Sequence, residues 1–346
     1  MLLYITLIGE ENLMKKNKYN AVVVGAGSIG AMKPDKFDGP KTKNILTIAH
    51  AFYKHPQINF VGIVDIDAKK SHDAAIKWKT KSYLSVHMVQ EKSIDILALC
   101  IPTEFHYPFI KNNFDTPIIK SPKIILAEKP FCETYNEATA ARDILRRAVI
   151  PTSIDYIRRY DKSMQELKSK FDKGIYGEAY SCTIHYDRGL YRDGCHAIDI
   201  CNFLFGKNLG GSVLPGRRAN DYDDKDLSYP VHMVYEKCGN VFMIPGDGRA
   251  HSIFEIDIIF EKARIKLVDH GLKMEVYNVE PEKTYGSYKS LSAKHKTIKT
   301  HLNNALYNYV DNAVNFLDGK EQLICTAKDA VETQGILYDL TRGKYL

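Results

Sequence analysis

The feature that most constrains the fold is a valine-rich run that ends in three closely spaced glycines. Ala21–Val24 is followed by Gly25, Gly27 and Gly30, in the spacing G-x-G-x-x-G. A short apolar run of this kind is typical of a strand buried on both faces of a parallel sheet. Gly25 permits a tight turn, Gly27 lets the backbone approach a pyrophosphate, and Gly30 permits close packing of the next element. The residues expected at a bound dinucleotide are Gly25, Ala26, Gly27, Ser28, Ile29 and Gly30.

The pattern of apolar and polar residues changes near the middle of the chain. With 346 residues it exceeds one ordinary core, so two domains are expected. Strand and helix patterns alternate up to about residue 150, whereas residues 254–258 and similar segments alternate apolar and polar side chains, as in an antiparallel sheet with one wet face. We therefore predict an α/β fold, with an N-terminal Rossmann parallel sheet and a C-terminal α+β domain whose large sheet is mainly antiparallel and open-faced.

The expected boundaries follow from these patterns. Residues 1–18 are expected to be a dispensable extension, 19–150 the dinucleotide-binding domain, and 151–346 a domain for substrate binding and oligomerisation. Helices are also expected at 302–317 and 328–341, near the end of the chain, and these helices could pack back on the first domain. The other expected strands are 59–64, 94–101, 124–127 and 151–156, and the other expected helices are 68–78, 133–148 and 193–206.

Prolines interrupt the helix that should begin directly after the glycine turn. Pro34 and Pro40 break the pattern, and an apolar helical period resumes only at Ile45, to stop near Pro56. Residues 31–42 thus form a loop beside the expected cofactor mouth. The loop is either a flap over the ligand or an ordinary surface loop.

An acid ends the second expected strand. A carboxylate at Asp65 would accept hydrogen bonds from the adenosine ribose hydroxyls and repel a 2′-phosphate, so NAD is favoured over NADP. Asp67 could share this role, or it could be a helix N-terminal acid.

Two further motifs follow expected strands at the edge where α/β sheets bind ligands. Pro102, Thr103 and His106 follow the strand at 94–101, and His106 either lines the nicotinamide pocket or is a structural histidine at a helix start. Glu128 and Lys129 follow the strand at 124–127 and are expected at the cofactor. Pro130 favours an extended conformation at Lys129. A lysine held there could bind a substrate hydroxyl and stabilise a developing alkoxide, although most lysines at strand ends are simply solvated.

Polar clusters in the second half supply the remaining candidates. Tyr156, Arg158 and Arg159 could bind a hydroxylated or phosphorylated ligand, or they could form a salt-bridge patch between domains. Asp193 begins the expected helix at 193–206 and His196 lies one turn in, so both could project towards the same opening.

Charge and cysteine usage exclude several classes. The net charge of +6 comes from 48 basic and 42 acidic residues scattered along the chain, which argues against nucleic acid. No stretch is apolar enough to span a membrane, and residues 2–8 lack the flanks of a signal peptide. Seven cysteines without a pairing pattern indicate reduced thiols in a cytoplasmic protein. Cys195, His196 and Cys201 lack a second ligand pair, so no metal site is expected.

These motifs, in this order, resemble the Gfo/Idh/MocA family of oxidoreductases, named for glucose-fructose oxidoreductase and inositol dehydrogenase. The resemblance runs from about residue 20 to residue 206. It implies that Lys129 and His196 face the nicotinamide. Many members carry an aspartate four residues before the histidine, where this chain has Arg192. The stretch from Tyr186 to Asp199 is similar instead to a subgroup associated with bacterial surface-sugar pathways.

The resemblance implies hydride transfer between NAD, or less readily NADP, and a hydroxyl or keto carbon of a sugar, cyclitol or nucleotide sugar. Lys129, His196 and Asp193 would be catalytic, with His196 as the general base. Tyr156, Arg158, Arg159 and Arg192 would bind the substrate with them. A homo-oligomer, dimer or tetramer, is implied as well. The alternatives are a dinucleotide-binding sensor or scaffold without turnover, and a reductase of a non-sugar carbonyl.

Overall fold

The computed structural model describes residues 19–89, 93–116, 120–216, 218–282, 284, 286 and 288–342. The extension expected over residues 1–18 lies outside this part of the chain. None of the helices within it is both long enough and apolar enough to cross a membrane.

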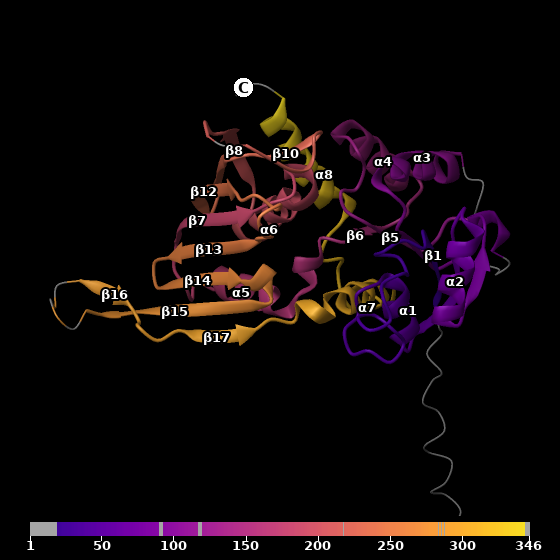
Figure 1. The fold of residues 1–346 in the computed structure, drawn as a ribbon, viewed down its shortest axis with the longest axis horizontal. Coiled ribbons are helices and arrows are strands. Elements are labelled where there is room, and N and C mark those ends of the chain that lie inside the picture. Colours follow the sequence, from indigo (N-terminus) through magenta and orange to yellow (C-terminus); the bar gives the residue numbers. More distant parts are fainter. Residues whose placement is uncertain are drawn as a thin grey trace, which may run out of the picture.

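The first domain is a six-stranded parallel sheet in the order expected of a Rossmann fold. Across the sheet, the strands are β3 (Lys81–Tyr83), β2 (Ile58–Val64), β1 (Tyr19–Val24), β4 (Ile96–Leu99), β5 (Ile124–Ala127) and β6 (Thr152–Ile154). The helices are α1 (Ile48–Lys54), α2 (Ala68–Trp78), α3 (His106–Ile110) and α4 (Tyr135–Arg147). In Figure 1, α3 and α4 lie above the strands and α1 lies below them. Strands β1, β4 and β5 are covered on both faces, which explains their continuous apolar runs.

The helix that follows the glycine turn is interrupted rather than lost. Ile48 and Ala49 donate backbone hydrogen bonds to the carbonyls of Ile29 and Gly30, at 3.0 and 2.9 Å. Helix α1 therefore continues the hydrogen-bond ladder of the turn, and the insertion loops out between its two parts. The Thr47 side chain caps the resumed helix.

The second sheet has nine strands and is mostly antiparallel, with one parallel pair, β7 and β12. Its strands are β16 (Lys289–Leu291), β15 (Lys273–Pro281), β14 (Ala263–Val268), β13 (Glu255–Phe260), β7 (Ala179–Tyr186), β12 (Cys238–Pro245), β11 (Val231–Tyr235) and β8 (Asn208–Val213), with β17 (Lys296–Lys299) also paired to β15. A separate hairpin consists of β9 (Ala219–Asp223) and β10 (Asp226–Ser228).

One face of the nine-stranded sheet is buried and the other is not. Cys182 and Ile184 of β7 are buried, whereas Ser181, Thr183 and His185, which alternate with them along the strand, are only partly covered. The predicted open-faced sheet is thus confirmed. The helices of this half are α5 (Lys162–Asp172), α6 (Cys195–Phe205), α7 (Ala305–Leu317) and α8 (Ala327–Thr341).

The last two helices return to the first sheet. Helix α7 packs against α1, and α8 packs against α4 and β6. The Tyr309 hydroxyl, from α7, donates to the Ser153 carbonyl at 2.8 Å. The chain end therefore packs along the β6 edge of the Rossmann sheet.

Candidate functional site

A cavity of about 1570 Å³ opens at the carboxyl edge of the first sheet. The loops after β1, β2 and β5 meet there, at the place where open α/β sheets bind ligands. The expected site residues found in its lining are Gly25, Gly27, Ser28, Ile29, Asp65, Pro102, Thr103, Glu128, Lys129, Arg192 and Asp193.

The three glycines of the turn are needed for different reasons. Gly25 has φ +104°, and a Cβ there would lie 2.4 Å from the Cys100 carbonyl oxygen. A Cβ on Gly30 would lie 2.0 Å from the oxygen of Gly25 itself. A Cβ on Gly27 would meet nothing within 4 Å, and this residue borders the cavity. The turn is therefore closed behind by Gly25 and Gly30 and is open at Gly27, which fits a backbone that receives a pyrophosphate.

The carboxylate of Asp65 is fixed by two backbone groups. It accepts from the amide of Ala26 at 2.8 Å and from the amide of Asp67 at 2.9 Å. The Ala26 amide thus donates within the protein, and the contact expected between Ala26 and the cofactor stays a prediction. Asp67 caps α2 by accepting from Lys69 and Lys70, as its helix-terminal interpretation predicts. Both oxygens of Asp65 retain lone pairs for ribose hydroxyls.

His106 is a structural residue and does not line the cavity. Its side chain is fully buried, with the ring nitrogens 2.9 Å from the carbonyl oxygens of Phe131 and Ile101. Burial lowers its pKa. The expectation that it borders the nicotinamide is corrected because both polar atoms of the ring serve the loops behind α3.

Lys129 lies in the cavity wall and reaches across to the second domain. Its ammonium donates to the carbonyl oxygen of Arg192 at 2.7 Å, and the thiol of Cys195 approaches the same oxygen at 3.3 Å. The Lys129–Pro130 peptide bond is cis. Lys129 is therefore placed at the junction between the first sheet and the turn Leu190–Gly194, which precedes α6.

An acidic hairpin holds this turn in place. The carboxylate of Asp226, on β10, accepts from the amides of Tyr191 and Arg192, each at 2.9 Å. Asp226 also lines the cavity, together with Asp223 and Lys225. No expectation from the sequence included this wall, although the run Asp221–Asp226 contains four acids, which would have been its signal.

His196 does not line the cavity, contrary to the expectation that it shares an opening with Asp193. Its half-buried ring lies edge-on to Tyr156 and Phe254, with centroids 5.9 and 6.5 Å apart. Burial, with the positive charges of Lys129 and Arg158, lowers its pKa well below the usual value, so the imidazole is neutral. Asp193 does line the cavity, and its carboxylate pairs with Arg188 at 2.8 Å rather than with His196.

The two neighbouring arginines have separate surroundings. The Arg158 guanidinium covers the Phe254 ring at 3.8 Å and donates to the His270 carbonyl at 3.3 Å. Burial lowers its pKa to about 10. Tyr156 is buried, and its hydroxyl has no hydrogen-bond partner among the described residues. Neither Tyr156 nor Arg158 lines the cavity.

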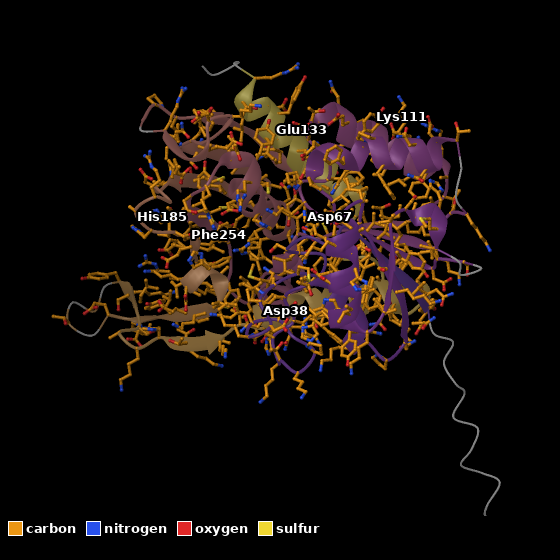
Figure 2. All side chains as sticks on the ribbon, turned by 45° about the vertical axis from the view of Figure 1, so that its right-hand side comes forward. Asp38, Asp67, Lys111, Glu133, His185 and Phe254 are labelled. Carbon is orange, nitrogen blue, oxygen red and sulfur yellow. The ribbon has the colours of Figure 1, made fainter. Side chains whose placement is uncertain are left out.

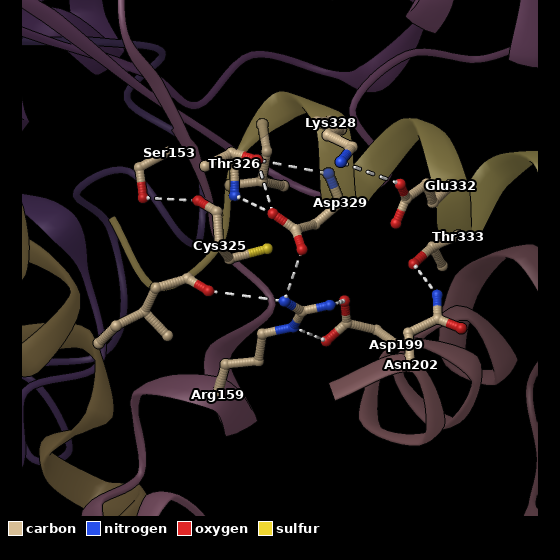
Figure 3. A network of polar contacts seen from close by, with 12 residues as sticks. Ser153, Arg159, Asp199, Asn202, Cys325, Thr326, Lys328, Asp329, Glu332 and Thr333 are labelled. Carbon is tan, nitrogen blue, oxygen red and sulfur yellow. Dashed lines mark hydrogen bonds and ion pairs between the residues drawn. The ribbon is translucent and has the colours of Figure 1, made fainter. Parts of the chain in front are cut away.

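Arg159 belongs to an interior ion pair (Figure 3). Its guanidinium contacts both oxygens of Asp199, at 2.8 and 2.9 Å, and one oxygen of Asp329 at 3.0 Å. The side chain is only about 5% exposed. The expected ligand contact is therefore replaced by the alternative, a salt bridge that joins the segment after β6 to α6 and α8.

The insertion after the glycine turn is a packed loop. The fully buried carboxylate of Asp38 accepts from the amide of Leu46, the hydroxyl of Thr47 and Nδ1 of His50, at 2.6 to 2.8 Å. No residue of 31–42 belongs to the cavity lining. In Figure 2, Asp38 lies near the lower edge, away from Asp67 and Glu133, which do line the cavity. The structure therefore gives no support to a flap over the ligand.

Other lining residues carried no recognisable sequence signal. They come from the loop after β3, from α3 and its continuation, from the segment before α4, and from the turn 190–194. They include Ser85, His87, Asn112, Glu133, Thr134 and Tyr191. Within the described ranges, no three His, Cys, Asp or Glu side chains gather as a metal site, and all seven cysteines are buried free thiols.

The first part of the chain matches a known family. Residues 19–154 match the model of the oxidoreductase family with an NAD-binding Rossmann fold, Gfo/Idh/MocA. Among curated proteins, the oxidoreductase YrbE of Bacillus subtilis is 24% identical over 205 residues, which are 54% of each chain. An oxidoreductase of Schizosaccharomyces pombe is 26% identical over 108 residues, 31% of this chain and 28% of the yeast protein. The chain thus matches about half, or less, of the length of these relatives.

Solved structures share the fold over nearly the whole chain. The WlbA dehydrogenase from Bordetella pertussis, in complex with NADH and UDP-GlcNAcA, superposes with a TM-score of 0.71 at 14% identity, over 94% of this chain and 95% of that one. A putative myo-inositol dehydrogenase from Sinorhizobium meliloti has a TM-score of 0.68 at 16% identity, over 94% and 97%. At these identities the likeness shows the architecture alone.

Motif order, strand order and the family match agree. Residues 19–154 therefore form an NAD-binding Rossmann fold that matches the Gfo/Idh/MocA family of oxidoreductases.

Proposed function

We propose that the protein transfers a hydride between NAD and a hydroxyl or keto carbon of a sugar, cyclitol or nucleotide sugar. The observation that carries the proposal is that the open face of Gly27, the carboxylate of Asp65 and the ammonium of Lys129 line one cavity. NAD held on the first two would supply the hydride acceptor or donor. Inositol dehydrogenase and UDP-sugar dehydrogenases among the structural neighbours support the substrate class.

Lys129 is the proposed contact for the substrate oxygen. An ammonium in a partly enclosed wall stabilises negative charge on an alkoxide more strongly than it would in water. We assign the proton transfer to His196, because its neutral imidazole can accept a proton and lies close enough to Lys129 for the ammonium to depress its pKa. This role requires the substrate to extend past Lys129 towards Tyr156 and Phe254. Asp193 and Arg192 are proposed to bind further hydroxyls, since both line the cavity.

We also propose that residues 19–150 and 151–346 form the two domains. We propose, second, that the protein functions in the cytoplasm and, third, that it self-associates through the open face of the nine-stranded sheet. The free thiols support the second of these proposals, and the partly covered Thr183 and His185 support the third.

The first test is calorimetric titration of the protein with NADH and NADPH. We expect NADH to bind more tightly than NADPH, because Asp65 would repel a 2′-phosphate. Asp65→Ala should weaken NADH binding and reduce the difference in affinity between NADH and NADPH. Tighter binding of NADPH would show that Asp65 is misassigned. Binding of neither, to folded protein free of dinucleotide, would remove the cofactor assignment.

The second test measures turnover with NAD and a panel of sugars, cyclitols and nucleotide sugars. Lys129→Ala and His196→Ala are each expected to lower kcat at least about tenfold, the usual scale for a lost acid–base group, while NADH binding persists. Lys225→Ala, which changes another cavity cation, is the matched control. Full turnover in both active-site variants would disprove the proposed chemistry, and the absence of any turnover by the parent protein would favour a dinucleotide sensor.

A further inference from the structure

Two carboxyl side chains lie next to each other at the ends of β5 and β6. The strands are parallel, with Ala127 paired to Ile154, so Glu128 and Asp155 are the next neighbours beyond the ladder. The amide of Asp155 still donates to the Ala127 carbonyl at 2.9 Å. In-register neighbours on adjacent strands are about 4.8 Å apart, so the register places the two carboxyl side chains next to each other, and each affects the pKa of the other.

The pair connects the cavity to the protein interior. Glu128 is half-buried and lines the cavity, whereas Asp155 is 4% exposed and does not. No N–H or O–H group of the described residues donates to Oδ1 of Asp155. Because ionised carboxylates have acceptors only, a hydrogen bond between the two side chains requires that one of them carries a proton.

The surroundings favour such a shared proton. The groups facing the pair are Lys129, Cys100 after β4, Tyr160 after β6, Tyr309 on α7 and Cys325 before α8. Burial raises the pKa of both thiols and of both phenols, so these four groups are neutral, and Lys129 is the cation that faces the pair. Burial, joined for Glu128 by the charge of Asp155, raises the pKa of both acids above their usual range, and the ammonium of Lys129 offsets this only in part.

We propose that Glu128 and Asp155 share one proton, and that Asp155 is a positioning residue through which this pair of acids presents one negative charge, not two, to Lys129. If both acids were ionised, their two negative charges would outweigh the single positive charge of Lys129 and would bind its ammonium. If only one acid is ionised, the ammonium remains a donor to the Arg192 carbonyl. In the proposed function, on which this inference rests, it also donates to the substrate oxygen.

The experiment is a carbon NMR titration of the side-chain carboxyls in the protein without cofactor. In the parent protein, a carboxyl assigned to Glu128 or Asp155 should titrate well above the usual values, which are about 3.9 for aspartate and about 4.3 for glutamate. Its signal is distinguished from that of Asp199, whose pKa burial raises to about 6. In Asp155→Asn, which keeps the shape of the side chain, the midpoint of Glu128 should fall by about one pH unit or more, because the neighbouring charge is gone. Glu128→Gln, at a half-buried position, should lower the midpoint of Asp155 in the same way.

Asp161→Asn is the matched control, because it also removes a buried carboxyl, at the cap of α5, away from the cavity. It should leave the titration of the pair unchanged. The free energy of unfolding gives a second measure: the native state holds an extra proton, so stability of the parent falls as pH rises from about 4 towards the raised pKa values. Asp155→Asn should flatten that fall, which the loss of a merely structural contact would not do.

The shared proton would be overturned if neither Glu128 nor Asp155 titrated above the usual range in the parent protein, or if neither substitution changed the titration of the remaining acid. Calorimetry with NADH on the same samples separates the two proposals. If NADH binds but neither acid titrates above its usual range, the shared proton is disproved and the proposed function is retained. If an acid of the pair does titrate above that range but NADH does not bind, the shared proton is retained and the cofactor assignment fails.

Discussion

At the residue scale, the glycines of the turn separate folding from cofactor binding. Gly30 faces the backbone oxygen of Gly25, so a methyl group there has no room unless the turn moves. Gly27 has open space on the side that borders the cavity. The same substitution, glycine to alanine, should therefore have opposite consequences three residues apart.

We expect Gly30→Ala to lower the free energy of unfolding by about 1–3 kcal/mol, the usual cost of forcing atoms into a packed site. Gly27→Ala should change stability by less than about 0.5 kcal/mol, as surface substitutions do, yet weaken NADH binding at least about tenfold by occupying space needed by the pyrophosphate. Urea denaturation and calorimetry measure the two effects. If Gly27→Ala left the NADH affinity unchanged, the pyrophosphate would not contact the turn at Gly27.

At the element scale, the β9–β10 hairpin acts on the site through the backbone of another loop. Asp226 holds two amides of the turn 190–194, and the Arg192 carbonyl of that turn holds the ammonium of Lys129. The hairpin thus sets the position of a side chain at the end of β5, on a different sheet. Gly189 permits this approach, since a Cβ there would lie 2.1 Å from Asp226 Oδ2.

Asp226→Asn should loosen the turn, because an amide offers one acceptor oxygen where the carboxylate offers two. Loss of a hydrogen bond to a charged group costs about 1.5–3 kcal/mol. We expect kcat to fall roughly tenfold and NADH affinity to change little, since the Gly27 and Asp65 side of the cavity is untouched.

Asp223→Asn is the control for Asp226→Asn. Asp223 lines the same cavity, but its carboxylate accepts from Lys225 within the hairpin. Equal effects of the two substitutions on kcat would show that the charge of the wall matters rather than its hydrogen bonds to the turn.

At the scale of the whole molecule, the Arg159 ion pair ties three distant segments together. Arg159 follows β6, Asp199 lies on α6, and Asp329 lies on α8 (Figure 3). Burial raises the pKa of Asp199 to about 6, against the opposing effect of the Arg159 charge. Without the guanidinium, a buried carboxylate would be left unpaired.

Arg159→Met should therefore lower the free energy of unfolding by about 3–5 kcal/mol, and Asp199→Asn in the same chain should restore part of the loss. Arg147→Met removes an exposed pair with Asp115, at 2.8 Å, and should cost no more than about 1 kcal/mol. Thermal or urea unfolding compares the three variants. A loss for Arg159→Met no greater than that for Arg147→Met would show that the interior pair contributes little.

The sequence by itself determined the features that depend on neighbours along the chain. The apolar runs at 21–24 and 124–127, the helix at 68–78 and the glycine spacing are local patterns, and the structure has strands, a helix and a turn there. The carboxyl-edge rule also brought Asp65 and Lys129 to one cavity, because parallel strands end on the same side.

The tertiary structure alone decided what each polar side chain meets. Arg158 and Arg159 are adjacent in the chain, but one covers an aromatic ring and the other enters an interior ion pair. His106 contacts backbone carbonyls behind the cavity, His196 lies beyond the cavity lining beside Tyr156, and Asp226 enters the cavity wall from a distant hairpin. Periodicity records which face of an element is buried, whereas partners separated by 30 to 170 residues are chosen by packing, which no local pattern contains.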